Sequence, residues 1–142
     1  MKTTTYQIEK LSGKAQAFKE RLTRGLRAYT ESKAGPFRAR EINLRIVGTK
    51  GRFIGSLSAV KYWNCLFIDK IWVEGKHRNQ GLGKRLLGRA EAEGRKLDCK
   101  ISHLNSHSLQ APGFYLKMGY KVFGQLKTYP KGQSVYHFFK KL

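Results

Sequence analysis

The stretch HRNQGLGKRLL, residues 77–87, combines two glycines with several basic side chains. Gly81 and Gly83 stand where an apolar, strand-like run has ended and a helical spacing of leucines begins. The first turn of a helix offers unpaired N–H groups and the positive end of the helix dipole, so an anion can bind there. Glycines let the anion approach the backbone, and Arg78 and Lys84 add positive charge. The stretch therefore predicts a phosphate-binding helix N-terminus.

Two common phosphate-binding motifs do not fit this loop. A Walker A loop needs Ser or Thr after its Gly-Lys pair, whereas Arg85 follows Lys84 here. A dinucleotide-binding fingerprint needs a third glycine where Leu86 stands. What remains is the pattern R-x-x-G-x-G directly after a strand.

A second block, LNSHSLQAPGFYLKMGY at residues 104–120, narrows the choice of ligand. Together with the R-x-x-G-x-G loop, it resembles the GNAT N-acetyltransferase superfamily, in which that loop holds the pyrophosphate of acetyl-coenzyme A. It is similar to a bacterial subgroup with the pattern L-D-T-x-S-F-Q-A-x-x-F-Y-x-K-x-G-Y. The resemblance is strong over residues 66–142 and weak before residue 42. It implies an acetyl-coenzyme A-dependent enzyme that moves an acetyl group directly from the thioester to a primary amine.

The resemblance also implies roles for individual residues. Tyr115, in the F-Y-x-K-x-G-Y ending, matches the family's general acid for the departing thiolate. Val73 matches the strand residue whose backbone N–H meets the thioester carbonyl. Pro112, early in the helix that carries Tyr115, predicts a late start or a bend there. The predicted cofactor-binding residues are Val73, Arg78, Asn79, Gln80, Gly81, Gly83, Lys84 and Ala111. The chain departs from the family pattern at Asn79, Asn105 and Leu109.

Acetyl transfer also needs a group that takes a proton from the amine, whose pKa is roughly 10 when it is lysine-like. Between residues 42 and 90 the only acidic side chains are Asp69 and Glu74, at or beside the strand that would carry the acetyl group. Either carboxylate could act catalytically through water, or could simply pair with neighbouring cations. His107 is a third candidate, because the ordinary pKa of histidine is near neutral. The sequence does not decide which of Asp69, Glu74 and His107 accepts the proton.

The order of the predicted elements indicates a layered α+β (α/β) fold that positions these residues, and the resemblance implies the GNAT acyltransferase fold. Its centre would be a mixed, mostly antiparallel sheet of about six to seven strands flanked by helices. Alternating or continuous apolar runs predict strands, and apolar spacings of three and four predict helices. The predicted strands are 3–9, 42–47, 53–63, 66–73, 99–105, 120–126 and 134–142, and the predicted helices are 15–34, 81–97 and 109–118. Residues 42–63 should form a hairpin.

Length and composition set further expectations. A chain of 142 residues suits a single GNAT domain over residues 1–142. No apolar run is long enough to span a membrane, and the first residues lack the features of a signal peptide. The two cysteines, Cys65 and Cys99, form no C-x-x-C pair and have no histidines at ligand spacing. We therefore expect a cytoplasmic protein without a metal, and no acetyl-cysteine intermediate.

Charge raises a rival hypothesis. With 29 Lys and Arg against 9 Asp and Glu, the formal net charge is +20. Such a surface attracts acidic proteins or nucleic acid, so a basic nucleic-acid-binding module, or a non-catalytic coenzyme A-binding module, on the same scaffold is the alternative. A polycationic acceptor would be repelled unless acidic side chains gather at the site. The acceptor could be a small molecule, a protein N-terminus or a lysine, and a homodimer is a further expectation.

Overall fold

The computed structural model describes residues 5–142. It forms two compact units, which divide between Pro36 and Phe37. The first unit contains helix α1 (Gln16–Ala34), close to the predicted helix at residues 15–34. Gly35 ends this helix with a φ of +78° and donates its N–H to the carbonyl of Glu31. None of the residues of α1 is buried.

The predicted strand at residues 3–9 is wrong where the structure describes it. Residues 5–9 form no regular element, and residues 3–4 lie outside the described part of the chain. Tyr6 and Ile8, whose alternation suggested the strand, are both exposed. Two alternating apolar residues are a weak signal, because a strand is stable only when a neighbouring strand pairs with it.

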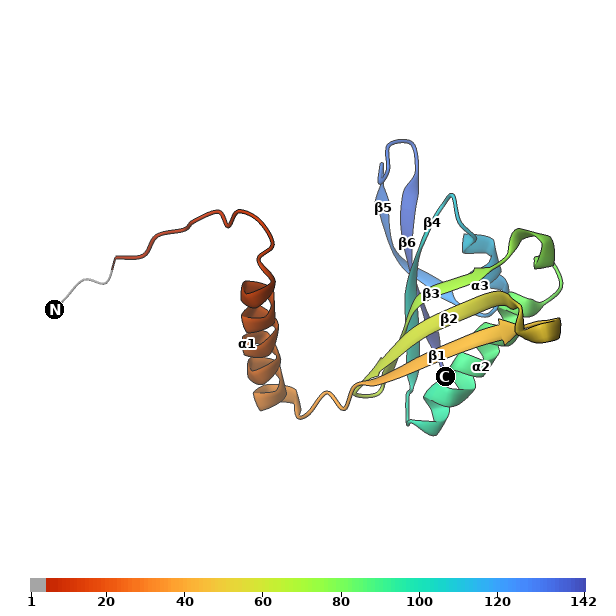
Figure 1. Ribbon diagram of the computed structural model, residues 1–142, viewed down its shortest axis with the longest axis horizontal. Coiled ribbons are helices and arrows are strands. Elements are labelled where there is room, and N and C mark those ends of the chain that lie inside the picture. The colour runs from red at the N-terminus through yellow and green to blue at the C-terminus, as the bar shows by residue number, and fades with distance from the viewer. Residues whose placement is uncertain (1–4) are drawn as a thin grey trace. The chain divides into compact units, whose positions relative to one another are not determined.

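The second unit is built on a six-stranded sheet in the order β1-β2-β3-β4-β6-β5 (Figure 1). Its strands are β1 (Arg40–Val47), β2 (Phe53–Tyr62), β3 (Cys65–Val73), β4 (Ile101–His107), β5 (Lys121–Lys127) and β6 (Ser134–Lys141). Every neighbouring pair is antiparallel except β3 and β4, which are parallel. The predicted mixed, mostly antiparallel sheet is therefore confirmed. The predicted hairpin is β1 and β2, joined through a short 3-10 turn, η1 (Thr49–Gly51).

Two helices of the second unit lie close to where the sequence predicted helices. Helix α2 (Leu82–Lys96) contacts β1, β2 and β3, and buries Leu86 and Ala90 of the predicted apolar face. Helix α3 (Pro112–Lys117) starts later than the predicted residue 109, because a proline is tolerated only in the first turn. The fully buried side chains of the core include Leu57, Leu66, Leu87, Leu104 and Phe138. No helix among residues 5–142 is long and apolar enough to cross a bilayer.

The parallel pair in the middle of the sheet is short. β3 and β4 pair only from Cys65 to Phe67 on one side and from Ile101 to His103 on the other. β3 nevertheless continues to Val73, so its second half has no ladder with β4. The backbone groups on that side of β3 beyond Phe67 are therefore not paired with β4.

Candidate active site

The loop after β3 has backbone angles that suit anion binding at the N-terminus of α2. Asn79 and Gly81 both have left-handed backbone angles, with φ of +59° and +75°. Gly81 is the N-cap of α2, and no side chain caps that end of the helix. Left-handed residues beside a helix N-terminus create a concave set of N–H groups that suits an anion. Asn79, which stands where the family pattern has glycine, tolerates this conformation because its short polar side chain is permitted there.

The two glycines of the loop serve different purposes. A Cβ added at Gly81 would meet no atom within 4 Å, so this position is open to an approaching ligand and needs glycine for its backbone angle. A Cβ added at Gly83 would lie 3.4 Å from the ring of Phe114 in α3. The absence of a side chain at Gly83 therefore lets the first turn of α2 pack closely against α3, which carries Tyr115.

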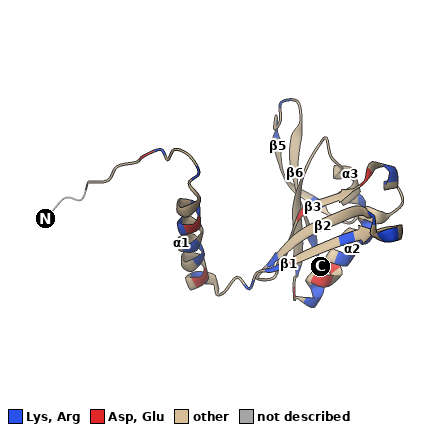
Figure 2. Ribbon diagram, in the orientation of Figure 1, with Lys and Arg blue, Asp and Glu red and all other residues tan. Residues whose placement is uncertain are grey.

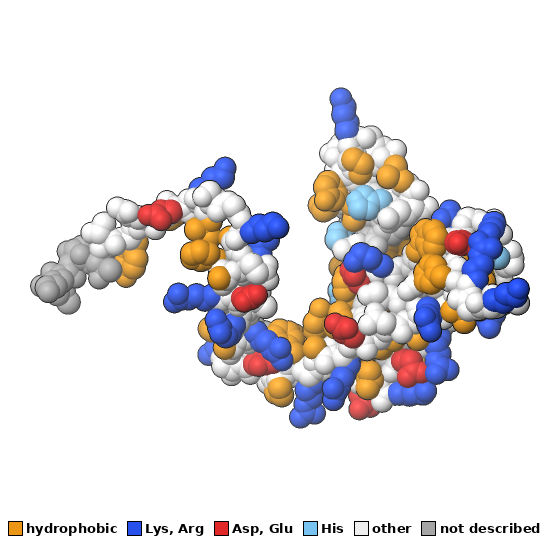
Figure 3. Space-filling model, viewed as in Figure 1, with side chains coloured by type: hydrophobic (Ala, Val, Ile, Leu, Met, Phe, Trp, Pro, Cys, Tyr) orange, Lys and Arg blue, Asp and Glu red, His pale blue; other side chains and the backbone are white. Residues whose placement is uncertain are grey.

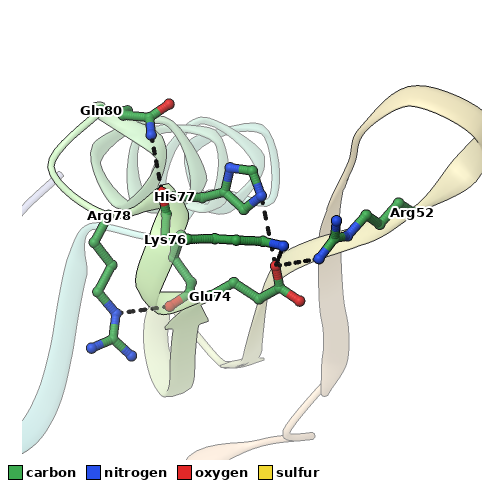
Figure 4. Close-up of polar contacts among 7 residues, drawn as sticks. Arg52, Glu74, Lys76, His77, Arg78 and Gln80 are labelled. Atoms are coloured by element: carbon green, nitrogen blue, oxygen red, sulfur yellow. Dashed lines mark hydrogen bonds and ion pairs between the residues drawn. The ribbon is translucent and has the colours of Figure 1, made fainter.

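Arg78 connects the loop to the end of β3. Its Nε donates a hydrogen bond of 2.9 Å to the carbonyl of Val73 (Figure 4). The next N–H, that of Glu74, donates to Ile54 of β2 at 2.8 Å. Because successive N–H groups of a strand point to opposite sides, the Val73 N–H points away from β2, toward the gap beside β4. Arg78 thus fixes the peptide that follows the predicted thioester-binding amide, in addition to supplying charge.

Glu74, one of the two predicted catalytic carboxylates, is engaged by cations. Its Oε2 lies 3.4 Å from Arg52 Nη2, 3.6 Å from His77 Nε2 and 4.0 Å from Lys76 Nζ (Figure 4). These contacts tie the β1–β2 turn to the loop that precedes the phosphate-binding residues. Gln80 adds a hydrogen bond of 3.4 Å to the carbonyl of Lys76. Glu74 therefore helps to order this loop.

Basic side chains dominate this end of the molecule. Figure 2 places Lys and Arg at the β1–β2 turn and along α2, and Figure 3 shows them gathered on the surface around that turn and the loop after β3. Lys84, in the first turn of α2, is exposed. A cluster of this kind favours the approach of a phosphorylated ligand over a cationic one.

Tyr115 lies on α3 with its side chain directed into the core. It is 7% exposed, and its ring contacts Phe114, Tyr120 and Phe138 at centroid distances of 5.1, 6.1 and 5.6 Å. Burial raises the pKa of Tyr115 to about 12, so its phenol is protonated at neutral pH. A protonated phenol can donate a proton or a hydrogen bond, as a general acid must. Ala111, the N-cap of this helix, is exposed.

The second predicted carboxylate, Asp69, lies on a different part of β3. The register passes from Ser58–Lys70 to Ala59–Ile68, so Asp69 is the extra residue of a β-bulge. Bulges redirect side chains and are frequent beside active sites. Lys70 Nζ lies 2.6 Å from its Oδ2. Four residues separate Asp69 from Val73, roughly 13 Å along a strand, so a proton would have to travel to Asp69 through water.

Asp69 lines a hollow of about 310 Å³ on the sheet, called the acceptor hollow below. Its lining is formed by Glu41, Asn43, Ser58, Ala59, Val60, Tyr62, Phe67 and Asp69. The register aligns Glu41, Val60 and Phe67 across three strands. Two carboxylates thus line this hollow in a chain of net charge +20, and its lining contains no Lys or Arg.

Two residues of this region were missed by the sequence analysis. Glu41 lies just before the predicted strand at 42–47, and only the register of β1 with β2 shows that it shares the hollow with Asp69. His103 pairs with Phe67 at the last rung of the β3–β4 ladder, with ring centroids 4.9 Å apart. Burial lowers the pKa of His103, and the nearby His137 lowers it further. A neutral imidazole at this position can accept a proton.

The remaining candidates have simpler surroundings. His107 ends β4; its backbone N–H donates to Gln110 Oε1 at 3.1 Å and its ring faces Tyr129 at 5.7 Å. Cys65 and Cys99 are free thiols, and burial raises the pKa of each, so both are protonated at neutral pH. Protonated thiols are poor nucleophiles, which favours direct transfer of the acetyl group.

An uncapped helix N-terminus beside basic side chains, a strand end without a neighbouring ladder and a buried phenol are the features expected of an acyltransferase with a phosphorylated acyl donor. The comparisons with known proteins agree. The model of the acetyltransferase (GNAT) family matches residues 9–120, and the chain belongs to this family. GNAT enzymes use acetyl-coenzyme A as the acetyl donor.

Individual relatives and solved structures agree with this family assignment. The chain is 36% identical over 96 residues to the blasticidin-S acetyltransferase of Streptomyces morookaense, covering 67% of this chain and 71% of that protein. An acetyltransferase structure from Bacillus cereus ATCC 14579 has a TM-score of 0.87 and 28% identity, and the match covers 94% of this chain and 98% of that one. A protein from Bacillus anthracis, solved in complex with acetyl coenzyme A, has a TM-score of 0.65 and 23% identity over 72% of this chain and 62% of its own. The fold and the enzyme class, an acetyltransferase, are thereby confirmed.

Proposed function

We propose that this enzyme transfers the acetyl group of acetyl-coenzyme A directly to a primary amine. The observation that carries the proposal is the open N-terminus of α2, where Asn79 and Gly81 hold N–H groups toward a ligand beside Arg78. The pyrophosphate would bind these groups, with Gln80, Gly83 and Lys84 completing the loop. The thioester would then lie along the free side of β3, against the Val73 N–H, and continue toward Ala111 and α3.

Two residues carry the chemistry in this proposal. Tyr115 donates its phenolic proton or a hydrogen bond to the departing thiolate; its raised pKa keeps the phenol protonated and therefore a donor at neutral pH. The Val73 N–H stabilises the negative charge that develops on the carbonyl oxygen. For the base, Asp69 and Glu74 both stay candidates; from the acceptor hollow Asp69 could act through water. Glu74 stays a candidate, although its three cationic neighbours favour a role in ordering the loop.

The acceptor is proposed to be a small amine that carries positive charge. Long-range repulsion from a chain of net charge +20 would otherwise disfavour such a molecule. Glu41 and Asp69 supply the local negative charge that could hold it, and the rings of Tyr62 and Phe67 offer flat apolar surface. The similarity to a blasticidin-S acetyltransferase supports a small-molecule acceptor, and blasticidin S itself belongs in the first panel of test amines.

Several predictions from the sequence stay predictions. These are the membership of the bacterial subgroup with the L-D-T-x-S-F-Q-A pattern, the single-domain organisation over residues 1–142 and the cytoplasmic location. The homodimer and an acidic or nucleic-acid partner also stay predictions.

The decisive experiment follows the release of free coenzyme A thiol with a panel of amines that includes blasticidin S, lysine-containing peptides and neutral amines. We expect release with at least one amine, and Tyr115→Phe should lower kcat by about 100-fold, a typical loss for a removed general acid. Because the pKa of Tyr115 is raised to about 12, kcat should show no loss from its ionisation below about pH 11. Binding of acetyl-coenzyme A without thiol release would favour the non-catalytic alternative, and an active parent unaffected by Tyr115→Phe would remove Tyr115 from the mechanism.

A further inference from the structure

An ion pair between α2 and β6 has no role in the proposed chemistry; its carboxylate is buried, and the side chain of its lysine, Lys140, is 22% exposed. Glu91 of α2 is 3% exposed. Lys140 of β6 donates to both of its carboxylate oxygens, at 3.0 and 2.8 Å, and Arg95 approaches at 3.7 Å. Two well-packed apolar side chains are often at least as stable as a buried ion pair. Stability alone therefore gives a weak reason for this pair.

The ion pair extends to the residue that follows α3. Tyr120 is 2% exposed, and its hydroxyl lies 2.8 Å from Ser102 Oγ. Burial raises the pKa of Tyr120, the hydrogen bond with Ser102 lowers it, and the negative charge of Glu91 raises it. Lys140 Nζ also lies 5.6 Å from the centre of the Tyr120 ring.

Tyr120 in turn holds the last turn of α3. Its N–H donates to the carbonyl of Tyr115 at 3.0 Å, and the two rings meet edge to face at 6.1 Å. Gly119, with φ of +87°, makes the turn between them. A Cβ at Gly119 would lie 3.6 Å from Lys140 Cε, so Lys140 packs directly under this turn.

We propose that Glu91 and Lys140 are positioning residues for acetyl transfer, which hold Tyr115 at a fixed place relative to the cofactor. Helix α2 would bind the pyrophosphate at its first turn and, further along the same helix, holds Lys140 through Glu91. Lys140 in turn lies against the Tyr120 ring and under the turn at Gly119. The cofactor and its acid are thus attached to one rigid element. This inference rests on the proposed role of Tyr115 as general acid.

The test replaces the ion pair by apolar residues of similar size in the double variant Glu91→Leu/Lys140→Met. Because such a pair can preserve stability, we expect a thermal midpoint close to that of the parent. We expect kcat to fall by about tenfold while KM for acetyl-coenzyme A stays within about twofold, the pattern of a lost transition-state interaction. Tyr115→Phe should then cost less in the double variant than in the parent, because residues that act as a unit are not additive.

The matched control is Glu93→Leu/Lys96→Met, which removes an ion pair of 3.2 Å from the solvent-exposed side of the same helix. It should leave kcat, KM and the effect of Tyr115→Phe unchanged. Should the double variant not fold, Tyr120→Phe deletes only the buried hydroxyl that bonds to Ser102 beside this ion pair, and we expect it to lower kcat by about threefold with KM unchanged.

A readout independent of activity is the 19F resonance of 3-fluorotyrosine placed at position 115. We expect it to shift or broaden in the buried double variant, or in Tyr120→Phe, and to stay unchanged in the control. An unaltered resonance together with an unaltered kcat would overturn the positioning role. If Tyr115→Phe is silent in the parent, the proposed acid fails, whereas a shifted resonance would still show that the ion pair positions the ring.

Discussion

The two sides of the candidate site are built in different ways. The donor side, defined here as Val73, the loop at residues 75–83 and Tyr115, comes largely from one continuous stretch of chain and is made mostly of backbone groups. The acceptor hollow is assembled from side chains of three strands, and its two carboxylates belong to β1 and β3. Backbone groups that bind the cofactor act in the same way whichever amine is acetylated. Side chains that line a hollow, in contrast, discriminate between acceptors. Variants of the two sides should therefore have different kinetic signatures.

The largest effect is expected at Gly81. Gly81→Val places a β-branched side chain at a φ of +75°, a conformation that such residues rarely adopt, and fills the open space in front of the N-cap. The loop must then shift, and losing two charge-assisted hydrogen bonds to a phosphate costs about 3 kcal/mol or more. We expect the Kd of acetyl-coenzyme A, measured by calorimetry, to rise by about 100-fold or more.

The matched control is Gly88→Ala, on the same helix at a position where an added Cβ meets no atom within 4 Å. It should leave the Kd unchanged and stabilise the helix by about 0.5–1 kcal/mol. Under the donor-side hypothesis, Gly81→Val also weakens the acetylation of every amine equally. A Gly81→Val enzyme that binds acetyl-coenzyme A normally would show that the pyrophosphate lies elsewhere.

The same contrast explains what the sequence could and could not predict. The candidate phosphate-binding loop could be predicted because its glycines, its arginine and the following helix are contiguous, so local patterns contain the whole signal. The acceptor hollow was not found, since Glu41 and Asp69 are brought together only by strand register and by the bulge at Asp69. A bulge shifts the alternation of side chains by one residue, and no feature of the amino-acid sequence indicates where it occurs.

The predictions for the rest of the chain succeeded where the signal is local and failed where it depends on distant residues. Strands β1–β6 and helices α1–α3 carry strong local periodicity or turn residues, and the sequence predicted all of them within a few residues. The false strand at 3–9 and the unforeseen network around Glu91 both depend on partners far away in the chain. Glu91 is a charged residue on the helix, and the sequence does not show that it is buried and paired with Lys140 of β6.

A moderate, substrate-dependent effect is expected in the acceptor hollow. Glu41→Gln and Asp69→Asn each remove one negative charge with little change in shape. Partly exposed charge pairs contribute about 0.2–1 kcal/mol each, so the two changes together should raise KM for a cationic amine by up to about tenfold. KM for a neutral amine and KM for acetyl-coenzyme A should stay within about twofold, which steady-state kinetics with paired substrates can measure.

Asp98→Asn serves as the control for net charge alone. Asp98 is exposed and has a left-handed backbone with φ of +61°, which Asn tolerates. If Asp98→Asn raises KM as much as the hollow variants do, the effect is one of overall charge and the hollow does not select the amine. If Asp69→Asn instead lowers kcat by about 100-fold for all amines, Asp69 is the base for every acceptor rather than a selective anchor.

The smallest effect is expected at Glu74, and it separates two roles that the sequence could not distinguish. If Glu74 were the general base, Glu74→Gln would lower kcat by about 100-fold or more. As an organiser of the loop, it should matter little, since its contacts to Arg52, Lys76 and His77 are long and partly exposed. We expect Glu74→Gln to keep kcat within about twofold and to raise KM for acetyl-coenzyme A two- to threefold, as would Arg52→Gln. A large loss of kcat in Glu74→Gln that Arg52→Gln does not share would transfer the proton-accepting role from the acceptor hollow to the donor side.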